Sequence, residues 1–183
     1  MTALPQSPLG PTLETARLIL RPPMAEDFGS WAAFMADDCT RFIGGPQHPA
    51  VAWRGMATMT GAWVMEGFSM FSVIEKASGR WIGRLGPWRP HGWPGTEVGW
   101  GVIPEAQGKG YALEGAAAAI DWAFETLGWS EVIHTIDVEN RASIVLAMRL
   151  GSQRLRSAML PPPLEWPVEV YGQSRAHWQA RRR

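Results

Sequence analysis

The chain lacks several features that would by themselves assign it to a class of protein. It has one cysteine, Cys39, in 183 residues, so no intrachain disulfide can form and a reducing compartment is favoured. Acidic and basic residues balance at 17 each, which removes the usual electrostatic reason to expect nucleic acid or an acidic membrane as a partner. No apolar run reaches membrane-spanning length, and the N-terminus has neither the basic nor the apolar region of a signal peptide. We therefore expect a cytoplasmic protein that binds neither membranes nor nucleic acid.

The spacing that marks a metal site is also missing. The histidines are scattered along the chain, at His48, His91, His134 and His177. None of the short intervals by which zinc ligands are recognised occurs among them, so no metal is expected. His134 alternates with apolar residues in an expected strand, which favours a sheet-facing side chain over a catalyst. Cys39 has no base that the sequence places beside it, and it is interpreted as an ordinary thiol.

What is present is the composition of one globular domain. Apolar residues make up 46% and charged residues 19% of the chain, which is long enough to bury a core. No internal repeat or linker divides it. We predict a loose lead-in over residues 1–12, one domain over 13–178 and a basic tail over 179–183. The chain has 11 tryptophans, an unusual number, and most of them are expected in the core.

Hydrophobic periodicity predicts an α+β fold. Strands are expected over 13–21, 68–75, 81–87, 97–103, 131–137, 154–157 and 168–172. Helices are expected over 24–35, 51–64, 110–127 and 140–150, and residues 37–49 are expected to form a loop. The order β-α-α-β-β-β-α-β-α-β-β predicts one mixed, mostly antiparallel central sheet flanked by helices.

The stretch from Glu97 to Leu127 carries the clearest functional signal. It has the pattern of a strand, a short turn with Gly108, Lys109 and Gly110, and a helix. Backbone N–H groups in the first turn of a helix have no intrahelical partners, and they point together at a bound anion. The two glycines let the backbone come close to a bulky pyrophosphate, and the lysine adds positive charge. The turn is therefore interpreted as a phosphate-holding site.

Three kinds of phosphate loop can be separated by their spacing. A P-loop requires a hydroxyl residue after its lysine, and Gly110 stands there instead. A dinucleotide fingerprint that starts at Gly108 fails at Leu113. The pattern that fits is Q-x-x-G-x-A, formed by Gln107, Gly110 and Ala112. It resembles the acyl-coenzyme A loop of the GNAT N-acetyltransferases, and the expected order of elements resembles the GNAT fold.

A second match to this family lies at the start of the helix expected over 140–150. Asn140, Ser143 and Gly151 occupy positions that border the pantetheine arm in GNAT proteins, although Asn140 alone would be interpreted as a helix N-cap. The N-x-x-S spacing and the segment from Val170 to Ser174 resemble the branch that includes the ribosomal-protein N-terminal acetyltransferases of RimJ/RimL type. The resemblance implies acetyl-CoA as cosubstrate. The coenzyme-binding residues that it implies are Val102, Ile103, Gln107, Gly108, Lys109, Gly110, Tyr111, Ala112, Asn140 and Ser143.

The resemblance also implies catalytic roles. Glu97 opens the strand on which several family members place a general base, and the alternative is a solvated strand-end residue. A backbone amide near Val102 would donate a hydrogen bond to the thioester carbonyl oxygen as charge develops on it. Many members place a tyrosine that protonates the leaving thiolate where this chain has Ala147. Ser143 is the nearest hydroxyl by family position and is the candidate for that role.

The acceptor side is the least determined part. Trp88, His91 and Trp93 lie in a loop rich in glycine and proline, where they either enclose an amine substrate or pack beneath the loop; Trp88 and Trp93 are the candidates for substrate contact. The leading hypothesis is direct acetyl transfer to a primary amine, first a protein N-terminus or an amino-acid-like amine, second a small foreign amine such as an antibiotic. A catalytically weak acyl-CoA-binding module, a nucleotide-binding protein of another kind, and a homodimeric state stay open.

Overall fold

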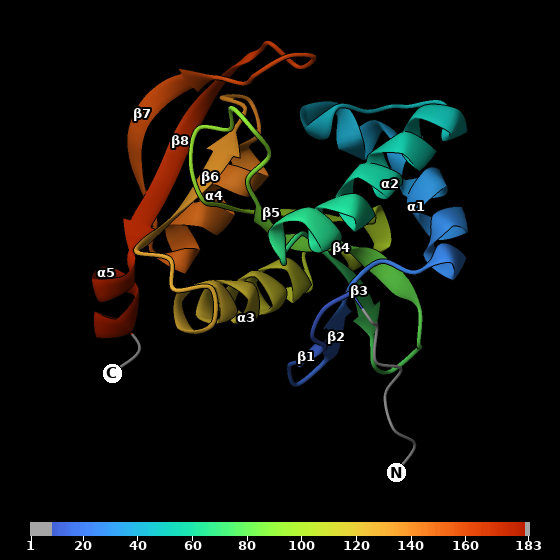
Figure 1. Cartoon of the computed structure of the whole chain (residues 1–183), viewed down its shortest axis with the longest axis horizontal. Coiled ribbons are helices and arrows are strands. Elements are labelled where there is room, and N and C mark those ends of the chain that lie inside the picture. Colours follow the sequence, from blue (N-terminus) through green and yellow to red (C-terminus); the bar gives the residue numbers. More distant parts are fainter. Residues whose placement is uncertain (1–8, 182–183) are drawn as a thin grey trace.

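The structure is a computed structural model, and it describes residues 9–181. These residues form an eight-stranded sheet with helices around it (Figure 1). Its strand order is β1-β2-β3-β4-β5-β6-β8-β7. The strands are β1 Leu13–Glu14, β2 Leu18–Arg21, β3 Phe71–Glu75, β4 Trp81–Trp88, β5 Glu97–Val102, β6 Glu131–Ile136, β7 Gln153–Met159 and β8 Pro167–Ser174. Strands β5 and β6 pair in parallel, and the other neighbours in this sheet pair antiparallel. The predicted α+β class, with a mixed and mostly antiparallel central sheet, is confirmed.

The helical elements of residues 9–181 lie between and after these strands. They are the 3₁₀ segments η1 Ala25–Asp27, η2 Asp38–Ile43 and η3 Pro104–Ala106, and the helices α1 Phe28–Met35, α2 Pro49–Glu66, α3 Tyr111–Glu125, α4 Arg141–Leu150 and α5 Arg175–Ala180. The four predicted helices correspond to η1 with α1, to α2, to α3 and to α4.

Three elements differ from the prediction. The strand expected over 13–21 is two strands, because the Thr15 hydroxyl accepts from Leu18 N–H and closes a turn between them. The loop expected over 37–49 contains η2, whose first turn is capped by the Asp37 carboxylate. Helix α5 was not predicted, since six residues are too few for a helical period to appear. It begins at the cap residue Ser174 and buries Trp178.

Two hydrophobic clusters hold the helices on the sheet. The larger one lies between α3 and strands β2 to β5, and it includes Leu85, Val98 and Ala119, all without exposed surface. Small residues on α3 let it approach the sheet closely: a Cβ added at Gly115 would lie 2.5 Å from Leu85. The smaller cluster joins α1 and α2 to Trp81 of β4. Figure 1 shows α1 and α2 together on the opposite side of the molecule from β7 and β8.

Strands β5 and β6 pair at one register position and then separate. Glu97 pairs with Ile133, and no further pair follows in this part of the sheet. The imidazole Nδ1 of His134 lies 2.7 Å from the Val98 carbonyl oxygen, at hydrogen-bond distance. The next residue of β6, Thr135, donates its N–H to the Glu97 carboxylate. A side chain from β6 thus takes the place of the next ladder hydrogen bond, which opens a gap between the two strands.

The open edge of β5 can be assigned from its pairing with β4. Because Ile103 N–H donates to the Ile82 carbonyl at 3.0 Å, alternate residues of β5 bond to β4 and the others face β6. Val98, Trp100 and Val102 belong to the second set. The carbonyls of Val98 and Val102 are taken by side chains rather than by a strand, which agrees with this assignment. The backbone N–H groups of Trp100 and Val102 therefore face the gap.

A buried ion pair fixes the start of α1 against the sheet. Arg21 of β2 donates two hydrogen bonds to the Asp27 carboxylate, at 2.8 and 2.7 Å, and Ser72 of β3 donates a third at 2.7 Å. Burial would raise the pKa of Asp27, but these hydrogen bonds, one from Met24 N–H and the charge of Arg21 outweigh it and lower that pKa. The pair positions the segment from α1 to η2, which borders the site described below.

The expected lead-in over 1–12 and basic tail over 179–183 lie partly outside the described residues. Among the described residues of these two segments, Leu9 packs against the larger hydrophobic cluster, and Gln179 and Ala180 belong to α5. No helix between residues 9 and 181 combines the length and the apolar character needed to cross a bilayer.

Candidate active site

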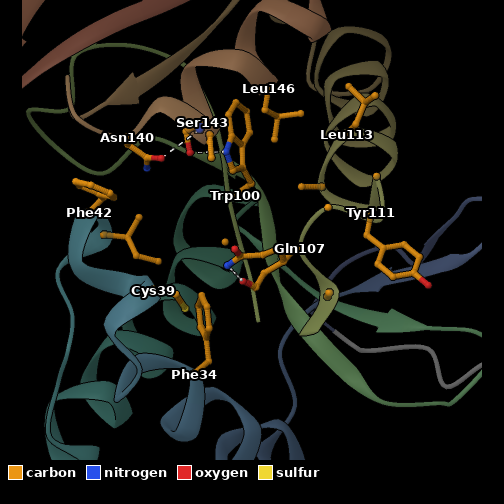
Figure 2. A pocket seen from close by; sticks show the side chains of 18 of the residues that line it. Phe34, Cys39, Phe42, Trp100, Gln107, Tyr111, Leu113, Asn140, Ser143 and Leu146 are labelled. Carbon is orange, nitrogen blue, oxygen red and sulfur yellow. Dashed lines mark hydrogen bonds between the residues drawn. The ribbon is translucent and has the colours of Figure 1, made fainter. Parts of the chain in front are cut away.

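A first cavity of about 400 Å³ opens at the gap between β5 and β6 (Figure 2). One wall is the 107–110 turn with the first turn of α3, and another is α4. The remaining sides come from β5, from Phe34 of α1 and from η2. The predicted loop at Gln107 to Ala112 and the predicted helix start at Asn140 are well separated in the sequence, but both border this one space.

The α3 end of this cavity has the geometry of an anion site. Gly110 is the N-cap residue with a φ of 81°, in the left-handed region that glycine adopts without strain, and it offers no capping side chain to the helix. The N–H groups of the first turn therefore stay available to a ligand, and the helix dipole favours an anion. Arg17 holds the turn from outside, because its guanidinium donates to the Lys109 carbonyl at 2.9 Å and to Glu114 at 2.6 Å.

The predicted coenzyme-binding residues line this cavity, with the exception of Ile103 and Lys109. Ile103 bonds to β4 through its N–H and packs against both cores. Lys109 is exposed, with its carbonyl held by Arg17. Tyr111 borders the cavity, but Figure 2 shows its ring turned away, where its hydroxyl bonds to Glu75. Gln107 donates to the Val102 carbonyl at 3.2 Å and so fixes the turn to the end of β5.

Asn140 and Ser143 form the α4 side of the cavity. The Asn140 side chain accepts from Ser143 N–H at 3.1 Å, so Asn140 is an N-cap, and it also lines the cavity. The Ser143 hydroxyl accepts from the Trp100 indole N–H at 3.2 Å, which joins α4 to β5 across the gap (Figure 2). Ala147 is fully buried on α4. Among the α4 residues that line the first cavity, Ser143 is therefore the one that carries a hydroxyl group.

A second cavity, of about 430 Å³, lies on the other side of Trp100. It is lined by β4, β5 and β6, by the 88–97 segment, by α2 and by the loop between β7 and β8. The residues that line both cavities are Phe42, Ile43, Trp100, Asn140 and Ser143. The two spaces therefore meet at these five side chains.

Glu97 lies in the second cavity and is buried, with 6% of its surface exposed. The alternative of a solvated strand-end residue is therefore wrong. Its carboxylate accepts from the Trp93 indole N–H at 2.5 Å and from the Thr135 hydroxyl at 2.7 Å. Burial raises the pKa of Glu97 to about 7, although these hydrogen bonds and the charge of Arg84 lower it in part. A carboxyl group with this pKa can accept and release a proton near neutral pH.

Trp88 and Trp93, both expected in a loop, pack together and line the second cavity; Trp88 is in fact the last residue of β4, and Trp93 lies in the loop that follows. Trp88 and Trp93 make an edge-to-face pair with ring centroids 6.4 Å apart, and His91 borders the same space. Trp93 also carries the N–H that orients Glu97. The sequence left enclosure and packing as alternatives, and the geometry combines them.

Arg84 is a buried residue of the second cavity that sequence reasoning missed. It lies in the middle of β4, where burial lowers its pKa to about 10 although the charge of Glu97 raises it in part. The sequence does carry a signal for it. An arginine stands within an otherwise apolar strand, and charged residues are rarely fully buried unless they are paired.

The other titratable residues near the cavities are less suited to chemistry. His134 is buried between the Val98 carbonyl and the Ser152 hydroxyl, and burial lowers its pKa to about 4 despite the first of these contacts. Burial raises the pKa of the Cys39 thiol to about 12, and Asp37 adds to the effect, so this thiol is not activated as a nucleophile. Among residues 9–181 no group of three or more potential metal ligands gathers.

The chain is similar to several known proteins. The chain is 31% identical to an acetyltransferase from Agrobacterium tumefaciens strain C58, over 96% of this chain and 99% of that one, with a TM-score of 0.82. It is 30% identical over 103 residues to the uncharacterised N-acetyltransferase YnaD of Bacillus subtilis, which is 55% of this chain and 61% of that protein. The fold is shared with RimJ of Mycobacterium smegmatis, solved in complex with CoA-disulfide, at 16% identity and a TM-score of 0.69 over 93% of this chain and 85% of that one. The profile of the acetyltransferase (GNAT) domain matches residues 17–153, and the chain belongs to this family of acyltransferases.

Proposed function

We propose that the protein moves an acetyl group from acetyl-CoA directly to a primary amine. The observation that carries the proposal is the shared wall of the two cavities at Trp100, Asn140 and Ser143. One cavity ends at an uncapped helix N-terminus, and the other holds a buried carboxyl group with a pKa near neutrality. This arrangement would let an anionic coenzyme from one side and an amine from the other meet at one point.

The first cavity fits the coenzyme. The N–H groups that follow Gly108 and Gly110 would hold the pyrophosphate, as helix N-termini hold phosphates in general. The open edge of β5 offers backbone groups to an extended pantetheine arm, and the Val102 or Trp100 N–H is free to donate to a thioester carbonyl oxygen. RimJ of Mycobacterium smegmatis, which has the same fold, binds a CoA derivative. Asn140 and Ser143 would close the α4 side of this space.

The second cavity would hold the amine, and Glu97, which lines it, would act as the base. Glu97 would take a proton from the amine, which frees the lone pair of nitrogen for attack on the thioester carbon. The nitrogen–carbon bond forms as the carbon–sulfur bond breaks, and the Ser143 hydroxyl is placed at the shared wall to protonate the leaving sulfur. Trp88 and Trp93 would contact the acceptor. Because a thiolate is a good leaving group, the base carries more of the rate than the acid.

The acceptor class follows less directly from the site. A protein N-terminus or an amino-acid-like amine is the first candidate, because the chain shares its fold with RimJ of Mycobacterium smegmatis. A small foreign amine such as an antibiotic is the second. The cytoplasmic location and a homodimer stay predictions.

A coupled assay tests the proposal. Free thiol release from acetyl-CoA is measured with a panel of amino acids, peptides and aminoglycosides, and the melting temperature is followed with CoA, ATP and NAD. We expect CoA to raise the melting temperature more than ATP or NAD, because a bound ligand stabilises the folded state. We expect thiol release that depends on an amine. Coenzyme binding without any turnover would show an acyl-CoA-binding module, and stabilisation by ATP or NAD alone would show a different nucleotide-binding protein.

A further inference from the structure

The second cavity contains two buried charged residues of opposite sign that do not pair with each other. Arg84 and Glu97 both line it and are both almost fully buried. The hydrogen bonds and ion pairs of the described residues include none between them. The Glu97 carboxylate is turned toward Trp93 and Thr135 instead. Buried opposite charges normally meet, because separation leaves each one poorly solvated.

Arg84 is short of acceptors. A guanidinium has five N–H donors, and the polar contact of Arg84 is one donation to the Met70 sulfur at 2.6 Å. Its Nε is buried without a partner, and the group also lies 5.4 Å from the Trp31 ring centroid. Sulfur is a weak acceptor and an aromatic face gives a modest attraction. A buried cation in this state is complementary to an anion that enters the cavity.

The register of β4 and β5 places the two charged side chains on the same face of the sheet. Glu97, Gly99 and Gly101 alternate onto one face of β5, and Arg84 is the direct partner of Gly101 on β4. The two charged side chains therefore rise from the same face, with Gly99 between them. A Cβ at Gly99 would lie 3.1 Å from the Glu97 carboxylate and 2.7 Å from Met70. Met70 and Glu97 therefore fill the space directly above Gly99, and the room for a ligand that contacts both charged groups is the cavity that Arg84, Glu97 and Gly99 all line.

The other walls of the cavity are apolar and aromatic. They are formed by Met59, Trp88, Trp93, Leu160, Pro161 and Trp166. The β4–β5 loop, with Trp93, and the β7–β8 loop, with Pro161, come together where a Cβ at Gly92 would lie 3.5 Å from Pro161. Arg156 also donates to the Pro94 carbonyl at 2.8 Å and ties the loop to β7. These contacts leave less room for a long polypeptide than for a small molecule with an apolar body.

We infer that the acceptor is a free α-amino acid with a large apolar side chain. Its carboxylate binds Arg84, its amine lies at Glu97, and its side chain packs against Trp88 and Trp166. This inference rests on the proposed acetyl transfer and narrows its substrate. The reaction exchanges one amine N–H bond and the thioester C–S bond for an amide bond and a protonated thiol. Arg84 takes no part in that exchange and acts as a specificity residue.

Four acceptors that share a benzyl side chain test the inference. They are L-phenylalanine, L-phenylalaninamide, phenethylamine and the dipeptide Phe-Ala, and kcat/KM is measured for each with acetyl-CoA. We expect phenylalanine to exceed the amide and phenethylamine by at least about tenfold, since a hydrogen-bonded charge pair is worth that factor or more. The variant Arg84→Met should lower kcat/KM for phenylalanine by a similar factor through KM. It should change the value for phenethylamine by less than about threefold, and Arg84→Lys should restore part of the preference.

Arg89→Met is the matched control. Arg89 also lies on the 88–95 loop side, but it is exposed, pairs with Glu66 and does not line the cavity. Its loss should leave the ratio between phenylalanine and phenethylamine unchanged. Equal kcat/KM values for phenylalanine, phenylalaninamide and phenethylamine would overturn this inference but not the proposed acetyl transfer. A higher kcat/KM for Phe-Ala than for phenylalanine would do the same. Absence of thiol release with every amine would overturn the proposed function and this inference together.

Discussion

The two cavities are similar in volume but are built in different ways. The first takes two of its walls from local features of the chain, the turn before α3 with its glycines and the N-terminus of α4, and side chains of β5, α1 and η2 complete it. The second is made of large side chains from β4, β5, β6, α2 and two loops, and it holds the buried charges of Arg84 and Glu97. A coenzyme that every reaction shares can be held by backbone groups, which depend on local conformation. An acceptor has to be selected by side chains that only the complete fold brings together.

The largest effect should come from the base in the second cavity. Glu97→Gln keeps the shape and the hydrogen bond from Trp93 but removes the proton acceptor, so kcat should fall by about 100-fold or more. Coenzyme affinity, measured by thermal shift with CoA, should stay within about twofold, because Glu97 does not line the first cavity. The steady-state assay at pH 8 makes the comparison. A loss below about threefold would remove Glu97 from the mechanism.

The next largest effect should come from the first cavity, where a change in the turn before α3 should weaken coenzyme binding without affecting the acceptor. Gly110→Ala places a side chain at a φ of 81°, which costs on the order of 1 kcal/mol of unfolding free energy. The added Cβ would also lie 3.4 Å from the Arg17 guanidinium that holds the turn. We expect the KM for acetyl-CoA to rise by about tenfold, with the KM for the acceptor nearly unchanged.

Gly128→Ala is the matched control for this change. Gly128 has a φ of 70° and open space around it, and it lines neither cavity. Both variants should lose similar stability in urea, but Gly128→Ala should keep the wild-type KM for acetyl-CoA. An equal rise in both variants would mean that global stability, and not the geometry of the turn, governs coenzyme binding.

A third change acts on the pKa of Glu97. The protonated carboxyl cannot accept the amine proton, so kcat/KM should fall as the pH drops through about 7. The Trp93 N–H stabilises the charged form of Glu97, and Trp93→Phe removes it while keeping an aromatic ring against Trp88. We expect the acidic limb of the pH profile to move to higher pH, by up to about one unit. Trp88→Phe removes no hydrogen bond to Glu97 and should leave the limb in place; a limb that moves equally in both variants would contradict this account.

The same contrast explains what the sequence could predict. Gln107, Gly110 and Asn140 could be found because the turn and the N-cap depend on short-range spacing, and the fold places all three on one cavity. The burial of Glu97 could not be found, since it depends on Trp93 and Thr135, which reach it from a loop and from a neighbouring strand. Arg84 could not be found, because its burial without a carboxylate partner is a property of the assembled sheet.

Ser143 should show the smallest effect, because the leaving thiolate needs little help. Ser143→Ala should lower kcat several-fold and leave CoA binding intact, but it also removes the acceptor of the Trp100 indole N–H. That loss alone could displace the ring that lines both cavities. Trp100→Phe separates the two roles, since it keeps the hydroxyl and removes the indole N–H. If Ser143 protonates the thiolate, Ser143→Ala should lower kcat more than Trp100→Phe does, and the double variant should lose more than either. If Ser143 only holds Trp100, the double variant should match the more damaging single variant, because the second change then removes a contact that is already gone.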